Sequence, residues 1–212
     1  MKTINHFLII AFVILLSSCY REQKMEMPPR TAEKYELFYS SRYKLDNGME
    51  IIQIPNRSTP VIACNVIVKV GSAYENVENS GVSHMLEHML FNGTRTRTQK
   101  QIYGEIDYYG GYNNAHTDYF YTNYILLMPK EYIAQGLDVQ SDMLFNSVIP
   151  AHKFDKEKGI VIEEIGRSED RASYFSDIAF FETLFKSTSL AQPVLGTRSS
   201  IRNLSRDAVL DF

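Results

Sequence analysis

Three stretches with different hydrophobic patterns follow one another along the chain. Residues 7–16 are an unbroken apolar run, residues 20–34 are polar and aperiodic, and ordered structure is predicted from about residue 35 onward. Beyond that point, short runs of β-branched and aromatic residues come first, and segments with helical spacing come mostly afterwards. This order predicts an α+β fold with a largely antiparallel sheet.

The individual strands and helices are predicted from these runs and from the turn residues between them. An Asp-Asn-Gly turn at 46–48 separates the runs 43–45 and 49–54 and indicates a hairpin. Longer runs predict strands at residues 60–70, 112–116 and 119–128. Helical spacing predicts helices at residues 81–90, 98–109, 129–146, 153–171 and 174–186, and two short helical starts within 200–212. No internal repeat is visible.

The first 34 residues are not expected to be part of the folded domain. The apolar run is too short to span a bilayer and is typical of a signal peptide, which we place at residues 1–18. Leu-Ser-Ser-Cys at 16–19 resembles a bacterial lipobox, in which Cys19 is lipidated and becomes the mature N-terminus. Residues 19–34 would then be a flexible tether, and residues 35–212 a domain anchored by lipid to a membrane surface of the bacterial cell envelope. The alternative is a plain secretory signal.

Composition and charge narrow the class of protein further. The 212 residues carry a net charge of −3, with 44% hydrophobic and 22% charged residues, which is ordinary for a globular protein. Lysines and arginines are scattered, so no nucleic-acid partner is expected. If Cys19 is lipidated, Cys64 has no cysteine left to pair with, and we interpret it as a packed thiol.

The main candidate for chemistry is the motif His84-x-x-Glu87-His88. Residues four apart lie on one face of a helix, so the two imidazoles can reach one point, and imidazole nitrogens are typical ligands of Zn²⁺. Glu87 would project beside the same point, where a carboxylate can take a proton from a metal-activated water. The alternative is an ordinary polar face of a helix.

A catalytic zinc site needs a third protein ligand. We expect a carboxylate rather than one of the remaining histidines. In the predicted helix 153–171, Glu157 and Glu164 lie two turns apart on one stripe with Ile160 and Val161. Carboxylates among apolar residues are costly to bury unless they coordinate or bond something. Either one is therefore a candidate ligand at this stage.

Residues 81–94 (GVSHMLEHMLFNGT) closely resemble the inverted zinc motif of the insulinase/pitrilysin/mitochondrial-processing-peptidase family. In that family the third ligand is a glutamate some seventy-odd residues downstream, the last residue of an E-x₆-E pair. Residues 157–164 (EKGIVIEE) match this pair, and this spacing favours Glu164 over its neighbour Glu163. The resemblance therefore implies one Zn²⁺ held by His84, His88 and Glu164, with Glu87 as general base and Glu157 as a supporting carboxylate.

The resemblance runs from about residue 43 to the end and also implies the fold and the activity. The fold would be a sheet with helices packed on one side, and the activity that of a zinc-dependent metalloendopeptidase. Two alternatives come from other classes of protein. One is a non-catalytic scaffold domain of the same fold that needs a partner half, and the other is a surface-anchored binding protein with a purely structural zinc.

Residues 110–117 form a glycine-flanked polar strand, which suits the edge of a sheet. An extended peptide substrate can pair with such an edge through its backbone. In the family a strand of pattern N-A-x-T-S binds substrate beside the zinc, and Asn114, Ala115 and Thr117 match it, whereas Asp118 replaces the serine. His116 is not assigned to the metal. The alternative is an edge strand with no such role.

The resemblance also implies a further partner. Family members pair one zinc-bearing domain with a second domain or subunit of similar fold, and the 194 residues after the signal amount to about one domain. The final segment reads as the start of a helix capped by Ser205, without a C-terminal cap. We therefore expect a partial chain that lacks the second half.

Overall fold

The computed structural model describes residues 40–212. The predicted signal peptide, the tether and Cys19 lie outside the described residues. The chain divides after residue 56 into two units. Within residues 40–212, no helix has the length and apolar character needed to cross a membrane.

The first unit contains the predicted hairpin. β1 (Ser41–Lys44) and β2 (Glu50–Gln53) pair antiparallel, with Ser41 opposite Gln53. The backbone N–H of Leu45 donates to the carbonyl of Met49 at 2.8 Å, and Gly48 adopts a φ of 90°, which favours glycine. The Asp-Asn-Gly signal therefore predicted this turn correctly.

The second unit is built on a three-stranded antiparallel sheet. Its strands are β3 (Val61–Val68), β4 (Tyr112–Thr117) and β5 (Thr122–Pro129), in the order β3-β5-β4. β5 begins three residues later than predicted, because Asp118 donates its backbone N–H to the carbonyl of Tyr121 and closes a turn. Among the described residues β4 pairs on one side only, which confirms that it is an edge strand.

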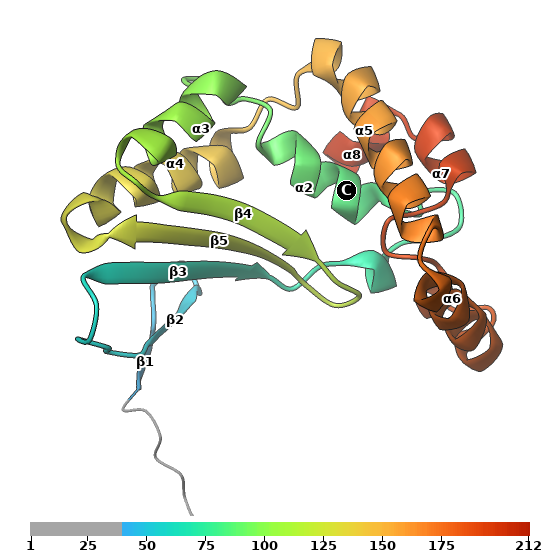
Figure 1. The fold of residues 1–212 in the computed structure, drawn as a ribbon, viewed down its shortest axis with the longest axis horizontal. Coiled ribbons are helices and arrows are strands. Elements are labelled where there is room, and N and C mark those ends of the chain that lie inside the picture. The colour runs from blue at the N-terminus through green and yellow to red at the C-terminus, as the bar shows by residue number, and fades with distance from the viewer. Residues whose placement is uncertain (1–39) are drawn as a thin grey trace, which may run out of the picture. The chain divides into compact units, whose positions relative to one another are not determined.

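Helices cover one face of this sheet (Figure 1). Tyr124, Leu126 and Met128 alternate along β5 and are buried on that face, as the period of a strand requires. α2 (Val82–Leu90) and α3 (Gln99–Tyr108) contact β4, while α4 (Ile133–Asn146) contacts β5. The fold is thus α+β, with an antiparallel sheet and helices packed on one side, as predicted.

Four further helices follow α4 in the described part of the chain. They are α5 (Ala151–Glu169), α6 (Ala172–Phe185), α7 (Arg198–Asn203) and α8 (Arg206–Asp211). Three short 3₁₀ turns join the elements: η1 (Ser72–Tyr74), η2 (Lys130–Tyr132) and η3 (Ser189–Ala191). α5 packs against α2 through its buried Val161 and Ile165 side. The predicted cap Ser205 does accept a hydrogen bond at the start of α8, from the N–H of Ala208.

Candidate metal centre

The histidine motif lies on α2, a helix that is buried over most of its surface. Val82, Met85 and Met89 are fully buried in the core, so they fix the rotation of the helix. With that rotation fixed, the side chains of His84, Glu87 and His88 line one cleft.

Glu164 of α5 completes a cluster with the two histidines. Its Oε2 lies 3.7 Å from Nε2 of His84 and 3.5 Å from Nε2 of His88. One ligand atom from each of the three residues lies within 4.8 Å of the others, and no other such group of three appears among residues 40–212. Glu163, the neighbour in sequence, is exposed.

The donors of this cluster fit zinc. Two imidazoles and one carboxylate are a ligand set that Zn²⁺ accepts at a catalytic site, where a fourth position stays open. His84 lies almost entirely out of solvent, and its Nδ1 has no hydrogen-bond partner. Burial, followed by the nearby charge of His88, lowers the pKa of His84 to about 4, so its imidazole is neutral near pH 7, the form that binds metal.

His88 is surrounded by carboxylates. Burial disfavours its charged form, but hydrogen bonds with Glu157 and Glu164 outweigh burial and raise the pKa of His88 to about 9. The same hydrogen bond from His88 lowers the pKa of Glu164. A proton on His88 and a divalent cation would therefore compete for the same position between these groups.

Glu157 acts on His88 rather than joining the cluster. Its Oε2 lies 3.3 Å from Nδ1 of His88, on the opposite side of the ring from Glu164. Asn92 holds the neighbouring backbone by donating its amide to the carbonyl of His88 at 3.0 Å. A carboxylate on the far nitrogen of an imidazole fixes the orientation of the ring and increases its basicity.

Glu87 is a buried carboxylate held by the edge strand. Only 8% of it is exposed, and Thr117 of β4 donates its hydroxyl to Oε2 of Glu87 at 2.5 Å. Burial raises the pKa of Glu87, against the opposing effect of this hydrogen bond. A carboxylate with a raised pKa is suited to accept a proton and return it.

The cluster opens into a cleft of about 560 Å³, and residues 114–119 form one side of it. Ala115 and Thr117 face the helices, whereas Asn114 and His116 alternate to the exposed face of β4. Asn114 donates its side-chain amide to the hydroxyl of Tyr112 at 2.7 Å. Of the three residues predicted to bind substrate, Thr117 is thus the one that donates a hydrogen bond to the candidate base, Glu87.

Sequence reasoning missed the opposite wall of the cleft. Tyr174, Ile178 and Phe181 of α6 line it, together with residues 191–195. The ring of Phe181 stacks on that of Tyr119 from the turn between β4 and β5, with 4.9 Å between centroids. The spacing of four and three residues along α6 could have revealed this face, but the helix is apolar on several sides and no face stands out.

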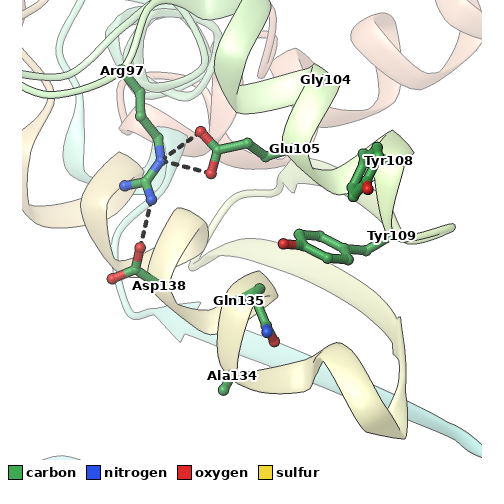
Figure 2. Close-up of a pocket in the computed structure, with 8 residues that line it drawn as sticks. All are labelled: Arg97, Gly104, Glu105, Tyr108, Tyr109, Ala134, Gln135 and Asp138. Carbon is green, nitrogen blue, oxygen red and sulfur yellow. Dashed lines mark hydrogen bonds and ion pairs between the residues drawn. The ribbon is translucent and has the colours of Figure 1, made fainter.

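A second hollow, of about 680 Å³, lies between α3 and α4 (Figure 2). Arg97 points into it and pairs with Glu105, Asp138 and Asp142. The rings of Tyr108 and Tyr109 lie on its far side. Among the described residues this hollow contains no histidine, and the three carboxylates all pair with one cation, the guanidinium of Arg97.

A family model and the sequences of known proteins were compared with the chain, and the two comparisons agree. Residues 51–198 match the model of the family described as "Insulinase (Peptidase family M16)". A protein of Rickettsia felis named "Uncharacterized zinc protease" is 35% identical over 169 residues, which cover 80% of this chain and 41% of that protein. The "Mitochondrial-processing peptidase subunit beta" of Saccharomyces cerevisiae is 33% identical over 174 residues, covering 80% of this chain and 37% of the relative.

Solved structures share the fold. A protease from Helicobacter pylori aligns with a TM-score of 0.77 at 24% identity, covering 82% of this chain and 42% of that one. A peptidase M16 domain from Pseudomonas fluorescens, described as inactive, aligns with a TM-score of 0.76 at 13% identity, with the same coverage. The chain thus spans about two fifths of the length of these proteins.

Proposed function

Because the chain belongs to the insulinase family, peptidase family M16, we propose that it is the zinc-binding part of a metalloendopeptidase. The observation that carries this proposal is the convergence of His84, His88 and Glu164 beside a buried, hydrogen-bonded Glu87. The names of its relatives support a zinc protease, but activity is inferred from this site.

Each residue of the site has a separate role in the proposed reaction. His84, His88 and Glu164 would hold one Zn²⁺, which when bound supplies Lewis-acid polarisation of the substrate carbonyl and of water. Glu87 accepts the proton of the attacking water and then delivers it to the leaving amine. Thr117 orients the carboxylate of Glu87, and Glu157 orients the ring of His88.

The proposed substrate is an extended peptide. β4 leaves one edge unpaired within the described sheet and lines the cleft next to the cluster. A peptide strand added to this edge would be bound mainly through its backbone, with Asn114 and Ala115 beside it. The stacked rings of Tyr119 and Phe181 would face the side chains of this peptide.

A second domain or subunit of similar fold is proposed to complete the enzyme. The chain matches about two fifths of the length of its relatives, and the yeast relative is named as a subunit. A second part would cover the cleft and contact the peptide from the other side.

The second candidate is a non-catalytic scaffold, since the inactive domain from Pseudomonas fluorescens has the same fold. Replacing Glu87 by Gln separates the two. For an enzyme, Glu87→Gln retains zinc but lowers cleavage of a mixed peptide pool at least about a hundredfold, as expected for loss of a general base. Zinc content is measured by metal analysis, and activity with the complementary half added.

His88→Ala is the control for this experiment, because it removes a ligand and should lose the zinc. Zinc loss in Glu87→Gln as large as in His88→Ala would contradict the role of Glu87. A wild-type chain that binds zinc but cleaves nothing, even with its complementary half, would favour the scaffold.

Anchoring by lipid on Cys19 is proposed from the sequence 16–19 and the apolar run before it. The protein would then lie in the bacterial cell envelope, on the periplasmic or outer-membrane side. Expressed in a bacterium, it should fractionate with membranes, and Cys19→Ala should release it. Wild-type protein recovered fully soluble outside the cytoplasm would contradict lipidation and leave secretion intact.

A further inference from the structure

The zinc helix α2 begins without a capping side chain of its own. Gly81 occupies the N-cap position with φ of 91° and has no side chain to accept a hydrogen bond, and the first turn has no acidic residue. The first N–H groups of a helix need acceptors, especially where they are buried. Acceptors for the first backbone N–H groups of α2 must therefore come from another part of the chain.

Glu75, which precedes α2 by several residues, supplies these acceptors. Its Oε2 accepts the backbone N–H of Gly81 at 2.7 Å, and its Oε1 accepts that of Ser83 at 2.9 Å. Only 6% of Glu75 is exposed. One carboxylate thus binds two N–H groups at the positive end of the helix that carries His84.

The backbone around Glu75 is fastened to the turn that forms one side of the cleft. The N–H groups of Ser72 and Ala73 donate to the carbonyls of Asp118 and Tyr119 at 3.2 and 2.8 Å. A Cβ on Gly71 would lie 2.1 Å from the carbonyl oxygen of Asp118, so the two backbones approach as closely as glycine allows. Glu75 therefore extends from a segment whose position is fixed by the β4–β5 turn.

The far side of the helix start is equally constrained. A Cβ on Gly81 would lie 2.6 Å from Cδ1 of Ile201 and 2.8 Å from the carbonyl oxygen of Leu195. The start of α2 is thus held between Glu75 and the segment that leads into α7. The core residues set the rotation of α2, and the two hydrogen bonds to Glu75 hold its first turn. Loss of one of these bonds would leave that first turn less tightly held.

We propose that Glu75 is a positioning residue of the metal centre: it fixes the start of α2 and thereby the placement of His84 and His88 relative to Glu164 on α5. This inference rests on the proposed zinc function. It goes beyond it by assigning a role to a carboxylate that touches neither the cluster nor the cleft.

Glu75→Gln is the sharpest test, because it preserves the size of the side chain. The amide keeps one acceptor oxygen and turns an NH₂ group toward the other backbone N–H, so one of the two hydrogen bonds is lost. Glu78→Gln is the matched control, since it makes the same chemical change at an exposed position of the same loop. Ile102→Val, in the buried face of α3, controls for a general loss of stability.

The measurements are zinc affinity, by competition with a chromophoric chelator at a temperature where every variant is folded, and amide hydrogen exchange of Gly81 and Ser83. Glu75→Gln should weaken zinc binding roughly tenfold and speed exchange at these two amides. Glu78→Gln and Ile102→Val should leave zinc affinity within about twofold of wild type, because sites without shared partners act independently.

The outcomes separate this inference from the proposed function. Wild-type zinc affinity in Glu75→Gln, with only a lower melting temperature, would overturn the positioning role and leave the zinc site standing. An equal loss of affinity in Ile102→Val would also overturn it. A wild-type chain with no measurable zinc binding would overturn the proposed function, and this inference with it.

Discussion

Two clusters of carboxylates in this chain show how differently the same side chains can be used. In the hollow between α3 and α4, Glu105 and Asp138 pair with the guanidinium of Arg97 (Figure 2). The buried Asp142 pairs with the same guanidinium. In the cleft beside α2, Glu157 and Glu164 flank His88, whose charge depends on its protonation. The first cluster contains its own permanent cation, and the second has only groups that can exchange a proton for a metal.

The difference explains why the hollow between α3 and α4 is not the better candidate for function. Arg97 is always charged, so its carboxylates are satisfied at any neutral pH, and the ion pairs join α3, α4 and the loop between α2 and α3. The cluster at α2 instead holds two histidines whose pKa values are shifted in opposite directions, that of His84 down to about 4 and that of His88 up to about 9. Such shifted titratable groups in a cleft are typical of functional sites.

The largest effect should come from removing the permanent cation. Arg97→Ala leaves Asp142 buried without its charged partner, so the free energy of unfolding should fall by about 3 kcal/mol. The zinc affinity of the folded chain should not change, because no ligand is involved. Urea unfolding at pH 7 and zinc titration check the two parts, and loss of zinc binding in folded Arg97→Ala would contradict the separation of the clusters.

Lowering the pH should also distinguish the two clusters. The expected loss of folding stability through Asp142 is somewhat smaller than that caused by Arg97→Ala. Although burial opposes it, hydrogen bonds from Thr94, Thr96, Arg97 and Asn146 lower the pKa of Asp142 to about 2. A folded-state pKa below the unfolded value stabilises the fold above about pH 4, and this contribution of about 2 kcal/mol is lost between pH 4 and pH 2. Bound zinc should leave earlier, as the imidazoles take up protons.

Urea unfolding at pH 7, 4 and 2.5 measures this loss. Asp142→Asn is the reference, because it removes the titrating group and should reduce the decrease between pH 4 and pH 2.5. The same decrease in wild type and Asp142→Asn would show that other carboxyls are responsible.

The smallest predicted effect sharpens the comparison within the metal cluster. Glu157→Gln keeps the three ligands but removes the charge beside Nδ1 of His88, so zinc affinity should fall roughly tenfold, or about 1.4 kcal/mol. Glu163→Gln, on the exposed side of the same helix, is the control and should have no effect. An equal loss in both variants would indicate a general effect of charge on α5 rather than orientation of His88.

Much of the fold followed from local patterns. The hairpin turn, the edge position of β4 and the cap at Ser205 depend on neighbouring residues, and the sequence predicted them. The start of β5 was placed too early, at 119, because the aromatic residues before Thr122 look like a strand. Phe120 and Tyr121 instead belong to a turn, and the exposed ring of Phe120 is a tertiary outcome that alternation does not encode.

The arrangement of the candidate site follows from the sequence where spacing along one helix determines it. His84, Glu87 and His88 share α2, and Glu157 and Glu164 share α5, so the helical period places each set along one side of its helix. The choice of Glu164 as the third ligand came from the family resemblance, and the role of each residue stays a prediction. The role of Thr117 toward Glu87 was not predicted. It depends on how β4 approaches α2, and no local signal specifies that contact.

The cluster also joins two helices that are distant in the chain. His84 and His88 belong to α2, while Glu164 lies 76 residues beyond His88 on α5. A metal bound by all three would act as a removable cross-link that closes this long loop. By mass action, free zinc at a hundred times its dissociation constant adds about 2.7 kcal/mol to the stability of the folded chain. Zinc supply would then set what fraction of the protein is folded, as well as whether it can react.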